Sequence, residues 1–209
     1  MREIGGVEMD RGALGRYRSK RDFAATPEPK GRRARRTRHA RFVIQKHDAT
    51  VLHYDFRLEA GGVLKSWAVP KGPSTSPRDK RLAMPTEDHP LEYATFEGLI
   101  PEGEYGAGPV IVWDRGTYRN LTTRDGDEVP VLQALEDGHL KFWLDGEKLT
   151  GGYSLRRTTI GRDRREKWLL VKLSDEAADA RRNPVSSQPR SVLSGRTIQE
   201  VAAGARSRH

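Results

Sequence analysis

The feature that most constrains the fold is a series of short, strand-like segments between residues 41 and 174. The clearest pair is Leu52–Glu59 and Val63–Val69, joined by a turn at Ala60-Gly61-Gly62, which is the pattern of a β-hairpin. Further strands are predicted at Arg41–Lys46, Arg81–Met84, Val110–Asp114, His139–Leu144, Gly152–Thr158 and Lys167–Leu173. The chain lacks the alternation of strands and long helices that builds parallel sheets. We therefore predict a mainly β fold, a compact antiparallel β-barrel with a few short helices.

Few segments outside these strands have helical character. Val131–Glu136 is the best helix candidate because Asp137-Gly138 supplies a stop signal after it. Arg115-Gly116 is interpreted as a turn that ends the strand before it. A short helix is predicted at Asp175–Arg182, with disorder beyond Asn183.

The net charge of +9 is distributed unevenly along the chain. Residues 1–41 carry 13 Lys/Arg against 5 Asp/Glu, whereas residues 42–174 carry 19 against 20. We predict three parts: a largely flexible basic arm (1–40) with a strap motif at 17–29, a folded domain (41–174), and a flexible polar tail (175–209). Such an arm binds nucleic-acid phosphates by counterion release, or simply keeps the protein soluble.

The absence of certain sequence features excludes several classes of protein. The chain contains no cysteine, which excludes disulfides, thiol nucleophiles and iron–sulfur clusters and fits a reducing compartment. No apolar run approaches the roughly 20 residues of a membrane span. The N-terminus lacks the apolar core of a signal peptide. We expect a cytoplasmic, nucleoid-associated protein that does not bind membranes.

The stretch Gln45–Leu58 carries the strongest chemical signal. In a strand, alternate side chains point to opposite faces, so His53, Asp55 and Arg57 share one face while Tyr54, Phe56 and Leu58 pack on the other. His47 lies close enough in sequence to fold back beside His53. Two imidazoles and a carboxylate form a facial donor set for a divalent metal, and an adjacent arginine suits phosphate. The alternative is a hydrogen-bonded polar surface facing solvent.

Further polar residues follow in the next segments and strengthen the metal hypothesis. Arg and Lys stabilise charge on transferring phosphoryl oxygens, and a histidine can donate a proton to a leaving group or bond a phosphate oxygen. The candidates are Lys71, Arg81, His89 and Tyr93. The glycine-dense run 103–108 lacks the phosphate-binding loop pattern and is interpreted as a turn.

Several long motifs resemble the 3′-phosphoesterase domain of bacterial DNA ligase D. They are F-V-I-Q-K-H-D-A-T-V-L-H-Y-D-F-R-L-E, L-K-S-W-A-V-P-K-G-P-S, E-D-H-P-L-E-Y-A-T-F-E-G and I-P-E-G-E-Y-G-A-G-P, with R-D-F-A-A-T-P-E-P in the arm. The resemblance extends from about Tyr17 to Leu173. Because neither a ligase nor a polymerase module follows, we expect a stand-alone member of this family.

The resemblance implies a β-barrel with a manganese-dependent site on a concave surface, with other divalent transition metals as alternatives. It also implies two activities at primer–template ends, which are removal of a 3′-terminal ribonucleoside and removal of the remaining 3′-phosphate to leave a 3′-OH for repair by non-homologous end joining. By position, His47, His53 and Asp55 match the metal ligands. Residues that match the phosphate-binding and catalytic groups are Arg57, Lys71, Arg81, His89 and Tyr93. Supporting positions match Arg21, Asp22, Glu28 and Glu87.

Two other functions fit parts of the pattern. His53-x-Asp55 followed by His89 has the form of a non-haem iron oxygenase triad, although the Arg/Lys cluster suits phosphate better. A non-catalytic DNA-binding repair module would use the basic arm alone. Expected partners are DNA or RNA–DNA primer–template 3′ ends, and a separately encoded ligase, polymerase or end-binding protein is a candidate partner.

Overall fold

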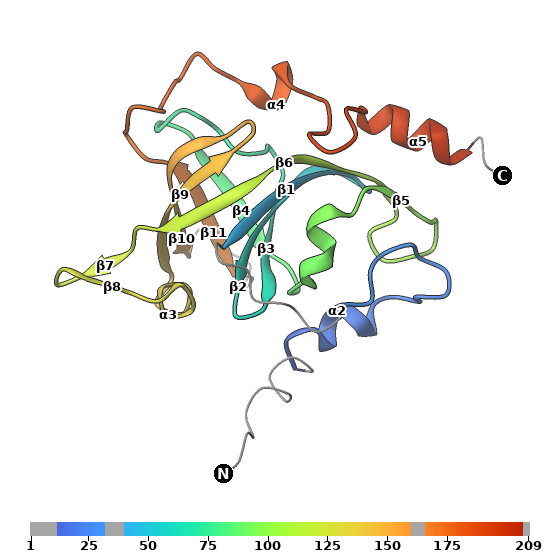
Figure 1. Ribbon diagram of the computed structural model, residues 1–209, viewed down its shortest axis with the longest axis horizontal. Coiled ribbons are helices and arrows are strands. Elements are labelled where there is room, and N and C mark those ends of the chain that lie inside the picture. The colour runs from blue at the N-terminus through green and yellow to red at the C-terminus, as the bar shows by residue number, and fades with distance from the viewer. Residues whose placement is uncertain (1–11, 32–39, 160–165, 207–209) are drawn as a thin grey trace, which may run out of the picture.

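The computed structural model describes residues 12–31, 40–159 and 166–206 of the 209-residue chain. Within these ranges, eight antiparallel strands form a barrel that closes where the first strand pairs with β6. Around the barrel, the strands are β1 (Arg41–Asp48), β2 (Leu52–Ala60), β3 (Val63–Val69), β4 (Lys80–Pro85), β11 (Lys167–Lys172), β10 (Thr150–Thr158), β9 (His139–Gly146) and β6 (Gly108–Asn120). The predicted mainly β, antiparallel barrel is confirmed (Figure 1).

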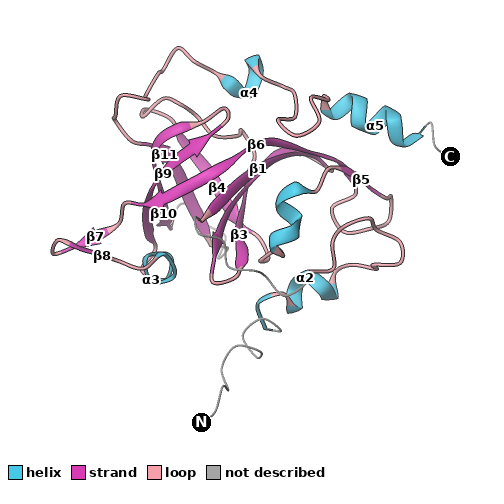
Figure 2. Ribbon diagram, viewed as in Figure 1, coloured by secondary structure: helices cyan, strands magenta, loops and turns pink. Residues whose placement is uncertain are grey.

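Short elements lie outside the barrel wall, as Figure 2 shows. Strand β5 (Gly98–Ile100) extends the sheet beyond β6, and β7 (Thr123–Arg124) pairs with β8 (Asp127–Glu128) in a separate ribbon. The helices are α2 (Gly15–Ser19), the 3₁₀ helix η1 (Leu91–Thr95), α3 (Val131–Glu136), α4 (Pro184–Ser187) and α5 (Ile198–Arg206). The helix predicted at Val131–Glu136 is confirmed with the same bounds.

Two hydrophobic clusters lie on opposite faces of the β1–β2 hairpin. Alternate residues such as Ile44 and Phe56 belong to the cluster that fills the barrel interior. Val43, on the other face of β1, packs in a second cluster with η1, β5 and Tyr17 of the arm. The outer face of the hairpin is therefore covered by a second layer, and side chains that point there are removed from bulk water.

The turn predicted at Arg115-Gly116 is wrong, because β6 continues through both residues to Asn120. A β-carbon at Gly116 would lie 2.0 Å from the carbonyl oxygen of Asp145 on the neighbouring strand. Gly116 thus allows the close approach of two backbones in the barrel wall, and glycine within a strand often marks such an approach.

The segment after the barrel makes extensive contacts with it, although the sequence predicts a flexible tail there. The indole Nε1 of Trp113 and the ammonium of Lys148 both donate to the carbonyl of Gln188, and Ile198 and Val201 of α5 bury Ile111. Figure 1 shows this segment running from α4 to α5 past β6. Asp175–Arg182 forms turns rather than the predicted helix. The mobility of the segment in solution stays a prediction.

Two sequence predictions concern parts that the description covers only partly. Most of the basic run from Lys30 to His39 lies outside the described residues, because residues 32–39 are not described. The part of the predicted flexible arm before Gly12 also lies outside them. In the described ranges, none of the helices combines the length and apolarity needed to cross a membrane.

Candidate functional site

Three side chains that could hold a metal ion meet at the turn end of the β1–β2 hairpin. His47 and His53 are paired directly across the two strands, and their ring centroids lie 4.8 Å apart. Asp55 follows on the same face of β2, with Oδ2 3.5 Å from His47 Nδ1 and 3.7 Å from His53 Nε2. One donor atom from each residue lies within 4.8 Å of the other two. The strand alternation predicted from the sequence therefore assembles the donor set.

Backbone carbonyls hold both imidazole rings in a defined orientation. His47 Nε2 lies 2.7 Å from the carbonyl oxygen of Gly106, and His53 Nδ1 lies 2.8 Å from that of Val51. A carbonyl can only accept, so each of these nitrogens carries the hydrogen. The opposite nitrogen of each ring faces Oδ2 of Asp55. Metal-binding histidines are oriented by this type of second hydrogen bond.

Asp55 is the electrostatic centre of the group. Burial alone would raise the pKa of Asp55, but Arg57, at 3.1 Å, and the two histidines hold it well below its usual value. Burial likewise lowers the pKa of His53, yet the hydrogen bond and charge of Asp55 outweigh this effect and the net pKa is raised. His47, Asp55 and Arg57 are 7%, 6% and 2% exposed, which excludes the solvent-facing polar surface.

His89 lies between two guanidinium groups. Its Nδ1 is 2.9 Å from Nη1 of Arg57 and 2.8 Å from the carbonyl oxygen of Glu87. Its Nε2 is 3.5 Å from Nη2 of Arg21. Burial first, and then the charges of Arg57 and Arg21, hold the pKa of His89 well below its usual value. The ring is therefore neutral at neutral pH.

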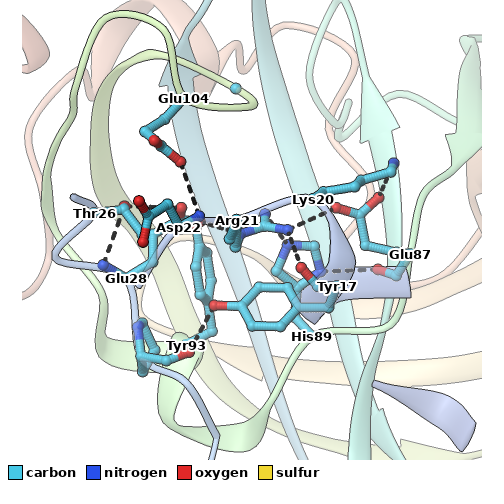
Figure 3. Close-up of polar contacts among 12 residues, drawn as sticks. Tyr17, Lys20, Arg21, Asp22, Thr26, Glu28, Glu87, His89, Tyr93 and Glu104 are labelled. Atoms are coloured by element: carbon cyan, nitrogen blue, oxygen red, sulfur yellow. Dashed lines mark hydrogen bonds and ion pairs between the residues drawn. The ribbon is translucent and has the colours of Figure 1, made fainter. Parts of the chain in front are cut away.

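The strap, defined here as residues 12–31, closes one side of the site (Figure 3). Arg21 donates to Glu28 at 2.8 Å and to Glu87 at 3.1 Å, while Tyr93 donates its hydroxyl hydrogen to Glu28 at 2.9 Å. Burial raises the pKa of Glu87, but hydrogen bonds from Lys20 and Arg21 outweigh this and lower it. Arg21 thus links the strap to the segment that carries His89.

These residues surround a pocket of about 280 Å³. The pocket is lined by the three candidate metal donors and by Arg21, Arg57, Glu87, His89 and Tyr93. Thr50 and Tyr105 also line it. A cation site, fixed arginines and a neutral imidazole therefore open into one cavity, an arrangement suited to binding an anionic ester and moving a proton on it.

Four predicted residues do not line this pocket. One of them, Glu28, still contacts the wall residues Arg21 and Tyr93. Lys71 is exposed in the loop after β3. Arg81 pairs in register with Leu170, a residue of the interior cluster, and its guanidinium contacts Asp79 at 2.8 Å. Asp22 accepts from the Ala24 backbone amide at 2.9 Å and shapes the strap turn. The structure brings Glu28 together with the other predicted site residues: Arg21, His47, His53, Asp55, Arg57, Glu87, His89 and Tyr93.

Sequence comparison places this site in a known family. The pattern of the DNA ligase D 3′-phosphoesterase domain matches residues 45–157. The chain belongs to this family. It is 54% identical over 190 residues, 88% of its length, to the multifunctional non-homologous end joining protein LigD of Pseudomonas aeruginosa. It is 44% identical over 163 residues, 77% of its length, to the protein of that name in Mycolicibacterium smegmatis. The chain spans 22% and 20% of these two relatives.

The match to the phosphoesterase domain family begins at Gln45, which the sequence analysis left without a role. Gln45 is fully buried, accepts from Arg57 Nε at 2.8 Å, and donates to the carbonyls of Tyr93 and Phe96 at 3.0 Å. It therefore holds Arg57 against η1. Its position two residues before His47, on the same strand face, was the available signal.

Tyr17 is a second residue that the sequence analysis missed. The Arg21 guanidinium lies 3.9 Å from the centroid of its ring, and the ring of His89 lies 5.0 Å away. Its hydroxyl donates to the carbonyl of Pro29 at 2.7 Å, which closes the strap on itself. The one indication of a role for Tyr17 in the sequence was its position at the start of the strap motif.

Proposed function

We propose that this protein is a metal-dependent phosphoesterase that removes 3′-terminal ribonucleosides and 3′-phosphates from primer–template ends, leaving a 3′-OH for non-homologous end joining. The observation that carries the proposal is the His47, His53 and Asp55 donor set beside Arg57 and His89 in one pocket. Membership of the 3′-phosphoesterase domain family supports the reaction class. The names of the relatives support a role in end joining.

The donor set fits a divalent transition metal such as Mn²⁺. Two imidazole nitrogens and one carboxylate oxygen suit this class of ion. The carbonyls orient both rings so that the other nitrogen of each ring faces Asp55, on the side where an ion would lie. When bound, the ion would neutralise phosphate charge as a Lewis acid. His47, His53 and Asp55 are the residues that would hold it.

The surrounding residues supply the remaining chemistry in this proposal. Arg57, fixed by Gln45 and Ser66, offers charge-assisted hydrogen bonds to phosphate oxygens. His89, neutral between Arg57 and Arg21, accepts a proton or bonds a phosphate oxygen. Arg21, Glu28, Glu87 and Tyr93 hold these groups in place. Roles for Lys71 and Arg81 stay predictions because neither lines the pocket.

The geometry favours this function over the iron oxygenase considered from the sequence. That alternative needs His89 beside His53 and Asp55, whereas the metal-donor group found in the described part of the chain joins them to His47. The nitrogens of His89 face arginine groups instead, and a guanidinium would repel a cation at that position.

The decisive experiment incubates the purified protein with a primer–template that ends in a 3′-ribonucleotide or a 3′-phosphate, with Mn²⁺ or with chelator. We expect loss of the terminal nucleoside and then of the phosphate, only in the presence of metal. Full activity in chelator would overturn the metal proposal, and absence of phosphate release with any divalent transition metal would overturn the phosphoesterase proposal.

Paired histidine variants test the assignment of the site. His53→Ala removes one of three donors, so calorimetric titration should show no Mn²⁺ binding and activity should fall below detection. His139→Ala changes a histidine at the start of β9, away from the donor set, and should leave both measurements unchanged. Equal behaviour of the two variants would place the metal elsewhere.

A further inference from the structure

Tyr105 is an exposed aromatic residue at the pocket that the function proposed above leaves without a role. It lines the pocket together with the metal donors, yet half of its surface is exposed, whereas Tyr93 in the same wall is 2% exposed. An aromatic ring left in water gains little from the core. The ring is therefore accessible to a ligand that enters the pocket.

The loop that carries Tyr105 is attached to the site at two points. The carbonyl of the next residue, Gly106, accepts from the metal donor His47 at 2.7 Å. The carboxylate of the preceding residue, Glu104, accepts from the backbone amide of Asp22 in the strap at 3.2 Å. Backbone bonds Glu104 N to Pro101 O and Ala107 N to Glu104 O close the turn. The ring is thus positioned relative to the donor set before any ligand arrives.

Positive charge accompanies the exposed ring. Lys20 Nζ lies 4.1 Å from its centroid and is itself paired with Glu87 at 2.9 Å. The ring therefore lies between the metal donors and the strap, with a partly exposed ammonium group beside it. An aromatic face next to a cation suits a nucleoside that carries a phosphate.

We propose that Tyr105 is a substrate-binding residue that stacks on the terminal nucleoside of the DNA strand and thereby places the 3′-phosphate at the donor set. This inference rests on the proposed phosphoesterase function and names how that site recognises its substrate. The donor set and arginines bind only the phosphate. A flat apolar surface beside them favours a nucleotide end over inorganic phosphate, whichever base is present, because every base has an aromatic face.

The test compares Tyr105→Ala with Tyr105→Phe on two 3′-phosphate primer–templates, one with a normal terminal base and one with an abasic terminal residue. On the normal substrate, Tyr105→Ala should raise KM roughly tenfold, with kcat changed less than about twofold, since a stacked base contributes about that much to binding. Tyr105→Phe should match the wild type. On the abasic substrate, Tyr105→Ala should cause no further loss.

Two further measurements keep the outcomes distinct. Fluorescence anisotropy of the labelled DNA without metal should show the same rise in Kd for Tyr105→Ala, independent of catalysis. Leu132→Ala changes a comparably exposed residue on α3 and should have no effect. Equal losses on both substrates, or Tyr105→Phe as weak as Tyr105→Ala, would overturn the stacking role. A wild type that binds DNA through Tyr105 but releases no phosphate would refute only the proposed function.

Discussion

His89 illustrates how its neighbours determine the chemistry of a single residue. The loop Glu87–Pro90 suggested a histidine that could donate a proton, but burial and two nearby guanidinium groups disfavour the imidazolium form. Arrival of a phosphate would add negative charge and weaken that effect. The resting site therefore contains a neutral imidazole beside the candidate metal donors.

The low pKa of His89 predicts a pH dependence of stability. Below its usual value of 6.5, the unfolded chain takes up a proton on His89 while the folded chain does not. The free energy of unfolding should therefore fall as pH drops below about 6.5, by at most about 1.4 kcal/mol per pH unit from this group. Urea unfolding between pH 5 and 8 should show a shallower dependence in His89→Gln. Identical slopes in the two proteins would contradict the assignment.

At the scale of elements, the strap is the part of the site that comes from farthest away in the sequence. Arg21 is separated from Glu87 by 66 residues, and both side chains are 3% exposed. A buried ion pair adds little stability by itself, but removal of one partner leaves the other charge uncompensated. The strap is consequently attached by an interaction that is costly to break.

Arg21→Met should therefore destabilise the protein by about 3–5 kcal/mol, because Glu28 and Glu87 both lose a partner. Protease cleavage within residues 12–31 should become faster as the strap separates from the barrel. Arg18→Met is the matched control, since the contact of the Arg18 guanidinium within the described residues is a 3.4 Å bond to the Lys30 carbonyl. Its change should stay within about 0.5 kcal/mol. A strap that resists protease in Arg21→Met would show that other contacts hold it.

The helix α5 should contribute to barrel stability although it lies near the end of the chain. Ile198 is 1% exposed against Ile111 and Val201. Ile198→Ala should cost about 2–3 kcal/mol of unfolding free energy, from lost burial and the cavity left behind. Leu193→Ala, at a residue that is 42% exposed, should cost less than about 0.5 kcal/mol. Equal thermal midpoints for the two variants would refute a structural role for α5.

At the scale of the whole molecule, charge and chemistry are in different regions. Residues 42–174 are nearly neutral by count, while residues 1–41 contribute most of the excess positive charge. The site itself needs only the few arginines that hold a phosphate. Affinity for the DNA backbone and hydrolysis at its end should therefore be separable by mutation.

Replacing the arm arginines with glutamine tests this separation. The residues are Arg32, Arg33, Arg35, Arg36 and Arg38. The slope of log Kd against log salt for duplex DNA should decrease by up to about 4.5, because each of the five phosphate contacts contributes roughly 0.9. At low salt, kcat on a saturating 3′-phosphate substrate should stay within about twofold. A proportional loss of kcat would indicate that the arm acts in the reaction itself.

Local periodicity in the sequence predicts the barrel strands and the candidate donor set of His47, His53 and Asp55. Because side chains along Leu52–Ala60 alternate between two faces, Asp55 and Arg57 lie on the face opposite the core residues. The short turn at 49–51 places His47 opposite His53. Such two-residue periodicity follows from strand geometry alone. Gly116 shows the limit, since a glycine needed for close strand packing and a glycine in a turn look alike in sequence.

The distant groups that reach the donor set become apparent only in the folded chain. Arg21, Gln45 and the Gly106 carbonyl meet His89, Arg57 and His47 through contacts across the strap, η1 and the loop 101–108. Arg81, predicted at the site, instead shares the interior face with Leu170. These outcomes depend on how the outer layer packs on the barrel. Spacing along the chain does not contain that information, because the entropy cost of closing a long loop changes little with its length.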